Sequence, residues 1–183
     1  MEPVTRAVHL ASTDSVDTHE LAAVAARTFP LACPPSIAPE NVASFIDTNL
    51  SAARFAEYLA DPQRVILTAR DDDRIVGYAM VVNGVGDDPD VARAVEVRPA
   101  AELSKMYVLP EFHGGELSAA LMERALAAVG GWGVRCVWLG VNQENVRAQR
   151  FYSKNGFRIS GTRTFLVGAD LREHDFVMVR ELD

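Results

Sequence analysis

The sequence contains few cysteines, and their surroundings argue against a metal site. Only Cys33 and Cys136 occur among 183 residues, and neither is accompanied by a second ligand at the spacing of a zinc site. We therefore expect two reduced thiols, one of them buried and inert, and no metal cofactor.

Long apolar runs are also missing. No window of about 18 apolar residues occurs anywhere in the chain, so a membrane-spanning helix is not expected. Residues 1–12 lack the apolar core of a signal peptide. The expected location is the cytoplasm, without a membrane partner.

Positive charge is in deficit. The 18 lysine and arginine residues are outnumbered by 25 acidic ones, which gives a net charge of -7. Because nucleic-acid binding needs a concentrated positive field to release counterions from phosphates, general affinity for nucleic acid is not expected. A small cationic molecule suits such a surface better.

What the chain does have is the composition of an ordinary globular protein. Hydrophobic residues make up 49% and charged residues 23%, and we see no internal repeat or low-complexity tract. A chain of this length can bury a core of its own, so we expect a single domain over residues 1–183.

The N-terminal part is predicted to begin with a strand and a helix. Residues 4–10 are typical of a strand, and Asp14 or Ser15 is expected to cap the following helix. Proline lacks a backbone donor and disfavours a helical conformation in the residue before it, so this helix is predicted to stop before Pro30.

The middle of the chain reads as helices followed by strands. Helical spacing of apolar residues marks residues 29–59 as a helical flap. Residues 64–70 and 74–82 are predicted to form a hairpin, residues 84–90 a loop, and residues 94–109 a longer strand.

The C-terminal part alternates helices and strands. Residues 117–129 and 145–155 are predicted helices, the second ended by a glycine, and residues 135–141 are a buried strand between them. Residues 157–168 and 174–182 are predicted antiparallel strands around an ADLRE turn. The element order indicates an α/β domain with a mixed sheet.

Two motifs follow in order: MYVLPEFHGGELSAAL at residues 106–121 and NVRAQRFYSKNGF at residues 145–157. Together they resemble the GNAT superfamily of acetyl-CoA-dependent N-acetyltransferases, and the C-terminal part resembles most the bacterial spermidine/spermine acetyltransferase group. The resemblance implies a mixed, mostly antiparallel central sheet of about seven strands flanked by helices. It also implies acetyl-CoA as co-substrate and a small-molecule amine as acceptor.

The first motif resembles the loop that holds the CoA diphosphate. Unpaired N–H groups and the positive end of a helix favour an anion there, and glycine lets the backbone come close. The resemblance places this loop on His113, Gly114, Gly115, Glu116, Leu117 and Ser118.

Glu116 stands where the family has glycine, and two interpretations remain open. Its carboxylate either opposes the phosphates or only occupies a helix's first turn, where the dipole favours an acid, and points to solvent.

The second motif supplies two further residues. By resemblance, Asn145 contacts the cofactor and Tyr152 lies near its sulfur; their seven-residue spacing is two helical turns. A phenol can donate a proton to a departing thiolate, which makes Tyr152 a candidate general acid. The alternative is a core tyrosine that packs beside Phe151.

The attacking amine must lose a proton, and Glu102 resembles the strand glutamate that serves as base in the histone-type members of the superfamily. An equal alternative is that Glu102 faces solvent on the strand or pairs with Lys105 or Arg98. Weaker candidates for the base are Glu96, His113 and Glu20.

The strand before the loop is assigned two more contacts by the resemblance. A bulge at Val108 would leave its N–H free to polarise the acetyl carbonyl, and Met106 would line the pantetheine channel. An equal alternative is that both residues only pack in the hydrophobic core.

The leading hypothesis is therefore direct transfer of an acetyl group from acetyl-CoA to a primary amine. The flap, residues 29–59, would form the acceptor pocket, and its acids Glu40, Asp47 and Glu57 would favour a polyamine unless they are a solvated face. The alternatives are a non-catalytic GNAT-fold binding protein and a protein or peptide N-acetyltransferase. The oligomeric state stays open, with a homodimer as one option because many members of the family are dimers.

Overall fold

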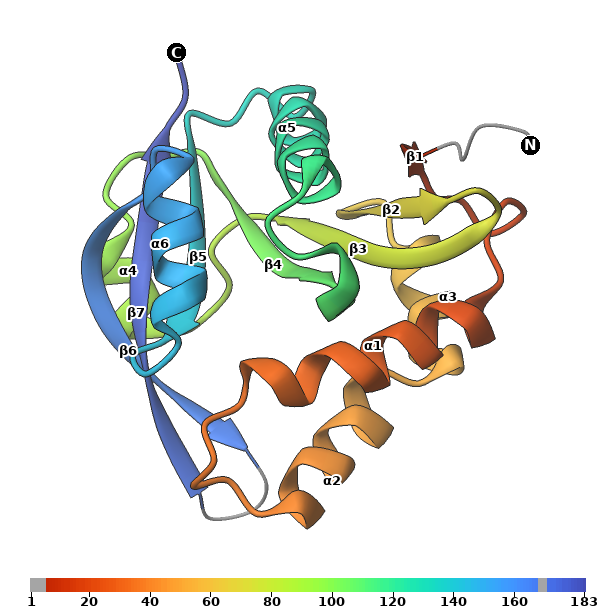
Figure 1. The fold of residues 1–183 in the computed structure, drawn as a ribbon. Coiled ribbons are helices and arrows are strands. Elements are labelled where there is room, and N and C mark those ends of the chain that lie inside the picture. The colour runs from red at the N-terminus through yellow and green to blue at the C-terminus, as the bar shows by residue number, and fades with distance from the viewer. Residues whose placement is uncertain (1–5, 168–170) are drawn as a thin grey trace.

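The computed structural model describes the backbone of residues 6–167 and 171–183 (Figure 1). In chain order the elements are β1 (Arg6–Leu10), α1 (Thr18–Ala32), α2 (Pro39–Asn49), α3 (Ala52–Ala60), β2 (Arg64–Asp71), β3 (Arg74–Asn83), α4 (Pro89–Ala94), β4 (Ala100–Val108), the 3-10 helix η1 (Pro110–Phe112), α5 (Glu116–Gly130), β5 (Cys136–Asn142), α6 (Val146–Lys154), β6 (Arg158–Val167) and β7 (Leu171–Glu181).

The strands form one seven-stranded sheet in the order β1-β2-β3-β4-β5-β7-β6. Every neighbouring pair is antiparallel except β4 and β5, which run parallel. The predicted fold class, a mixed and mostly antiparallel sheet flanked by helices, is confirmed.

The parallel pair of strands stays together only at its start. Ala100–Glu102 pairs with Cys136–Trp138, and no further pairs of β4 with β5 follow among the described residues. Figure 1 shows the two strands diverging beyond this point. Beyond this point the described backbone N–H and C=O groups of β4 and β5 face each other across a gap in the sheet, without hydrogen bonds between the two strands.

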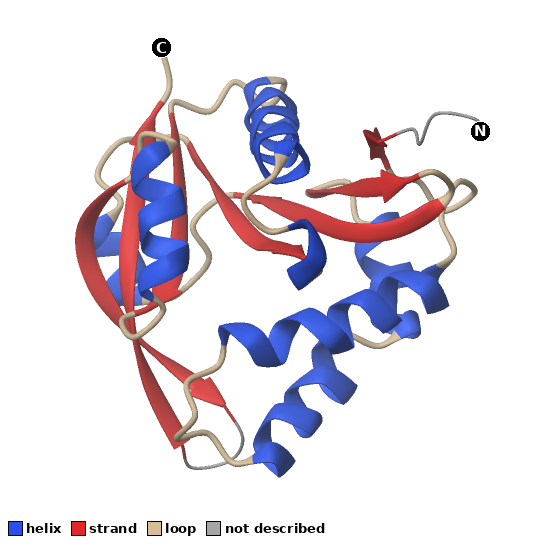
Figure 2. Cartoon of the chain, viewed as in Figure 1, coloured by secondary structure: helices blue, strands red, loops and turns tan. Residues whose placement is uncertain are grey.

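Helices cover both faces of the sheet (Figure 2). The helix α5 packs on β1–β4 from one side, while α1 and α3 pack from the other. Buried residues of α5 recur at the spacing of one helical face: Leu117, Leu121, Ala125 and Val129. This apolar face packs against the sheet, and the packing holds the start of α5 close to the end of β4.

A β-bulge interrupts β4. Lys105 lies opposite Met80 and Leu103 lies opposite Val81, so Ser104 is an extra residue with no partner on β3. The bulge was predicted at Val108, which instead lies in regular register with Gly77. That prediction was wrong because no sequence signal locates a single inserted residue within a run of strand-forming side chains.

The first helix begins and ends later than predicted. Asp17, rather than Asp14 or Ser15, is the N-cap and accepts hydrogen bonds from the N–H groups of His19 and Glu20. The helix also continues through Pro30. Only one helical hydrogen bond is lost there, in the last turn and on an exposed side, where water can satisfy the unpaired carbonyl.

Two boundaries near strands also differ from the predictions. Residues 89–94 form α4, capped by Asp88 with Pro89 in its first turn, where a loop and the start of a strand were expected. The last strand begins at Leu171, so part of the predicted ADLRE turn is strand; residues 168–170 lie outside the described residues. Residues 4 and 5 of the first predicted strand do too.

Other expectations agree with the structure. The hairpin of β2 and β3 is formed, and Gly156, with a φ of 87°, follows the end of α6. Within the described residues, no helix is long and apolar enough to cross a membrane.

Candidate active site

A cavity of about 750 Å³ lies where β4 and β5 separate. One side, here called the loop side, is lined by His113, Gly114, Ser118 and Asn145. The opposite side, the flap side, is lined by residues of α1, the α1–α2 connection and α2, by Glu102 and Lys105 of β4, and by Arg163 of β6 and Asp175 of β7. The cavity therefore joins the start of α5 to the helical flap.

The loop side presents main-chain donors at the start of α5. Gly115 is the N-cap of this helix and no side chain of the described residues caps it, so the first N–H groups are left for another acceptor. Gly114 has a φ of 73°, a left-handed conformation that favours glycine. Gly115, with φ -96° and ψ -174°, is extended and needs no such freedom. This arrangement suits a phosphate group.

The acid in the loop, Glu116, is exposed and does not line the cavity. It occupies the first turn of α5, where the helix dipole favours a carboxylate. Of the two interpretations left open by the sequence, the solvent-facing one describes its position. Leu117 next to it is buried in the core, so only its backbone can face a ligand.

The end of β4 is tied to the loop through His113. Its Nε2 lies 2.7 Å from the carbonyl oxygen of Val108, which makes this nitrogen the protonated donor. The N–H of Leu109 donates to Val76, so Val108 and Gly77 form a non-hydrogen-bonded pair of the ladder. The N–H of Val108 therefore points away from β3, toward the cavity, although Val108 lies outside the bulge.

The second motif reaches the cavity from α6. Asn145 is the N-cap of this helix, and its side-chain oxygen accepts from the N–H of Ala148 at 3.2 Å. Its two amide N–H groups remain available to donate to a ligand. Tyr152, two turns later, also lines the cavity. Its ring contacts Phe151 and Phe157 edge-on at 5.6 and 5.9 Å, so the packing expected of a core tyrosine is also present.

Burial keeps Tyr152 protonated. Desolvation raises the pKa of Tyr152 to about 12, against a smaller lowering effect of Arg147. Its hydroxyl therefore carries a proton throughout the neutral range and can donate it.

On the flap side, Glu102 and Lys105 lie in the cavity with opposite charges. Burial raises the pKa of Glu102, with Lys105, Arg163 and Arg64 acting against it. Burial lowers the pKa of Lys105, and the Glu102 carboxylate raises it. Within the described residues, the two side chains form no direct ion pair. A carboxyl with a raised pKa is a suitable proton acceptor near neutral pH.

The weaker candidates for the base are engaged elsewhere. Glu20 accepts the N–H of Ile75 at 2.7 Å, Glu96 is exposed and lines no part of the cavity, and His113 holds Val108. Arg98, considered as a partner of Glu102, donates to the carbonyls of Val95 and Ala92 instead.

The comparisons with known proteins agree with this geometry. The Acetyltransferase (GNAT) family profile matches residues 26–157. The chain belongs to the GNAT acetyltransferase family. It is 63% identical over 166 residues to an uncharacterised N-acetyltransferase of Mycobacterium tuberculosis, covering 91% of this chain and 98% of that protein. The predicted enzyme class, an acyltransferase, is confirmed.

Solved GNAT structures share the fold at low sequence identity. The PaiA N-acetyltransferase of Thermoplasma acidophilum, solved in complex with coenzyme A, superposes with a TM-score of 0.75 at 20% identity, over 97% of this chain and 99% of that one. A GCN5-related N-acetyltransferase of Rhodopseudomonas palustris gives 0.71 at 18% identity, over 100% and 99%.

One charged pair in this GNAT cavity was not predicted. Arg163 of β6 pairs with Asp175 of β7 at 3.2 Å, with side chains only 16% and 8% exposed, and lies over the Trp138 ring at 5.6 Å. Gly140 leaves room for it, because a Cβ there would collide with the guanidinium. The two residues meet through the strand register, which the sequence does not reveal.

The acids of the flap lie outside the cavity. Glu40, Asp47 and Glu57 are all exposed and none lines the cavity; Glu57 pairs with Arg54 at 2.6 Å instead. Their expected role in attracting a polyamine therefore has no structural support. The apolar wall of the flap side comes instead from residues such as Phe29, which stacks on Phe45 at 4.5 Å.

Proposed function

We propose that this GNAT protein transfers an acetyl group from acetyl-CoA to the primary amine of a small molecule. The observation that carries the proposal is the single cavity joining an uncapped helix N-terminus to Glu102. Acetyl-CoA brings a diphosphate, an extended amide-containing arm and a reactive thioester. The diphosphate needs an anion site, the arm needs main-chain hydrogen bonds, and the thioester needs groups that transfer protons. These sites have to follow one another along the cavity in that order.

The residues present suit acetyl-CoA. The N–H groups at the start of α5, from Gly115 to Ser118, are proposed to hold the diphosphate, with Gly114 giving the loop its shape and Ser118 adding a hydroxyl. The edge of β4 at Met106 and Val108, unpaired with β5, is proposed to hydrogen-bond the arm. The similar PaiA protein of Thermoplasma acidophilum, solved with coenzyme A, supports this donor.

Each step of the proposed reaction is assigned to one residue. Glu102 takes a proton from the acceptor's ammonium group, directly or through water, so that the neutral amine can attack. A main-chain N–H of β4 donates to the carbonyl oxygen as negative charge develops on it. Met106, opposite Ala79, is three residues along β3 from Val82, the partner of Glu102, whereas Val108, the residue that the family resemblance suggested, is five residues away. The N–H of Met106 is therefore the proposed donor, and that of Val108 is left to bind the arm.

As the carbon–sulfur bond breaks, Tyr152 donates its proton to the thiolate, which leaves as a thiol. The nitrogen loses its second proton as the amide forms, and this proton returns to the Tyr152 oxygen through water. Glu102 releases its own proton to solvent.

The acceptor is proposed to be a small molecule that fits the flap side of the cavity. A polyamine is the class that the family resemblance implied, but the flap acids that were expected to attract it face solvent and lie outside the cavity. A test with amines therefore has to include both polyamines and other classes.

Calorimetric titration with acetyl-CoA, followed by turnover assays on a panel of amines and short peptides, tests the proposal. Micromolar binding together with acetylation of a small amine is expected. Absence of acetyl-CoA binding would overturn the proposal and favour a non-catalytic member of the fold. Faster turnover of peptides than of every small amine would move the acceptor to a protein or peptide.

The role of Tyr152 is tested by Tyr152→Phe. Removing the donor is expected to lower kcat about 100-fold while the Kd for acetyl-CoA changes little. Tyr58→Phe is the matched control, because the Tyr58 hydroxyl donates to the carbonyl of Asn49 and lies outside the cavity. Unchanged turnover of Tyr152→Phe at every pH would remove the role of general acid from Tyr152.

A further inference from the structure

The bulge in β4 has a consequence for the acceptor. Glu102 and Lys105 are three residues apart, and on a regular strand they would point to opposite faces. Because Ser104 is the extra residue, Glu102 lies opposite Val82 and Lys105 opposite Met80, two positions on one face of β3. A carboxylate and an ammonium therefore enter the flap side of the cavity from the same face of the sheet.

The cationic side chains near Glu102 differ in whether a carboxylate pairs with them. Arg163 pairs with Asp175 at 3.2 Å, and Arg64 pairs with Asp61 at 3.1 Å. Lys105 has no carboxylate within ion-pair distance in the described part of the chain, and its Nζ makes only two long contacts of 3.4 Å to Ser104. A partly buried ammonium with such contacts is costly unless a ligand completes its shell.

We propose that the acceptor carries a carboxylate as well as its amine, with Glu102 receiving the ammonium group and Lys105 the carboxylate. This inference rests on the proposed function for the identity of the reaction, but the contact to Lys105 stands on its own geometry. It replaces a polyamine, whose second cation would face Lys105 with like charge, by an amino acid.

The spacing along the strand also bears on the length of the acceptor. Val82 and Met80 are two residues apart on β3, so the backbones of Glu102 and Lys105 are about 7 Å apart. A carboxylate separated from its amine by several carbon atoms can span such a distance. Suitable probes are therefore glycine, 4-aminobutyrate and 6-aminohexanoate, together with butylamine and the diamine putrescine.

Turnover of these probes is the first arm of the test. The best amino acid is expected to exceed butylamine and putrescine in kcat/KM by about tenfold or more, because the charge contact is made in a partly buried site. Lys105→Met should abolish this preference and Lys105→Arg should retain part of it. Equal rates on butylamine and 4-aminobutyrate, or a preference for putrescine, would overturn the inference.

A second arm needs neither turnover nor acetyl-CoA. The chain has only two lysines, Lys105 and Lys154, so protein labelled with ¹³C at lysine Cε gives two assignable signals, with Lys154→Arg as the assignment variant. Saturable movement of the Lys105 signal by an amino acid, but not by butylamine, is expected. Movement of the Lys154 signal alone, or of neither, would overturn the inference. A positive result here with no acetylation would instead count against the proposed function.

Discussion

The loop side of the cavity is built from main-chain groups of neighbouring residues, whereas the flap side is built from side chains that come from distant parts of the chain. The loop side needs only a glycine in the left-handed region and the uncapped start of α5. The flap side brings together α1, α2, β4, β6 and β7. The comparison indicates that donor binding tolerates substitutions of side chains, while acceptor choice depends on a few of them.

The sharpest way to test the flap side is Glu102→Gln, for which a fall in kcat/KM of about 100- to 10,000-fold is expected. Because burial raises the pKa of Glu102, the protonated acid cannot accept a proton below that pKa, and activity should rise with pH through it. The rising limb should disappear in the variant. Glu96→Gln, at an exposed acid, is the control. An unaltered pH–rate profile in Glu102→Gln would end the assignment.

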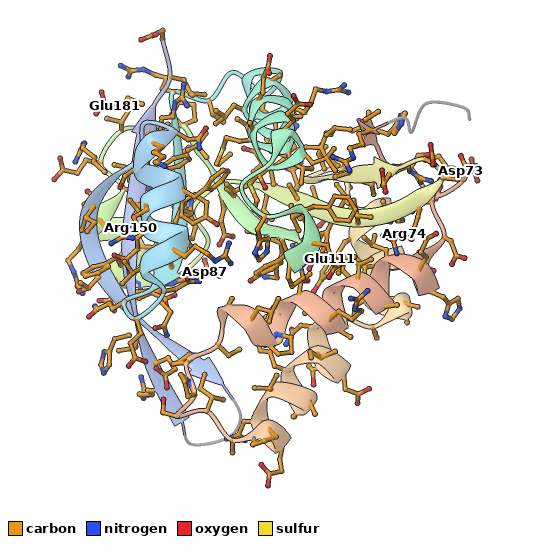
Figure 3. The ribbon with its side chains drawn as sticks, viewed as in Figure 1. Asp73, Arg74, Asp87, Glu111, Arg150 and Glu181 are labelled. Atoms are coloured by element: carbon orange, nitrogen blue, oxygen red, sulfur yellow. The ribbon has the colours of Figure 1, made fainter. Side chains whose placement is uncertain are left out.

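A large effect on stability is expected for Arg163→Met. The variant leaves the carboxylate of Asp175 buried without its partner, so the free energy of unfolding should fall by about 3–5 kcal/mol. The matched control is Arg158→Met on the same strand. Its pair with Glu181, which is labelled in Figure 3, is exposed and should contribute about 1 kcal/mol or less. Urea unfolding measures both. Equal losses would show that burial of the pair does not matter.

The loop side is tested by Gly114→Ala, for which about tenfold weaker acetyl-CoA binding is expected. The left-handed φ of 73° is about 1–2 kcal/mol less favourable for alanine than for glycine. The loop of the free variant therefore adopts another conformation, and restoring the binding conformation weakens binding. Gly133→Ala is the control, because Gly133 has a similar left-handed φ of 72° and open space for a Cβ but does not line the cavity. Calorimetry that finds the two variants alike would contradict the proposed role of this conformation.

The smallest effect is expected for Glu116→Gln. The exposed carboxylate is screened by water, so its removal should tighten acetyl-CoA binding only about two- to fivefold at low salt. The gain should vanish at high salt, because screening removes long-range repulsion between exposed charges. A gain of a hundredfold, or one independent of salt, would show that Glu116 faces the phosphates after all.

The same contrast explains what the sequence could predict. The loop side follows from local chemistry: two glycines before an apolar helical face, and Asn145 at the start of a capped helix, are readable as short motifs. The number of strands and their order along the chain followed from periodicity and from the family resemblance, whereas their order within the sheet was not predicted. Helix ends were less accurate, because Asp17 outcompeted two earlier residues of similar capping ability.

The flap side could not be read in this way. Lys105 was considered only as a possible partner of Glu102, and the sequence does not show that the two share a face, because it does not reveal the extra residue at Ser104. The pair of Arg163 and Asp175 depends on register between β6 and β7, which is a property of the folded sheet. The sequence also suggested that the flap acids bind substrate, because composition does not reveal that their side chains are exposed and lie outside the cavity.

The bulge at Ser104 also limits how relatives of this enzyme can be recognised. Removing that one residue would restore regular alternation and still leave Glu102 and Lys105 on the same face of the sheet. The strand can therefore gain or lose a residue here during evolution without turning either side chain away from the cavity. A search pattern with a fixed spacing from the glutamate to the glycines would miss such proteins, whereas one that allows a single-residue gap would find them.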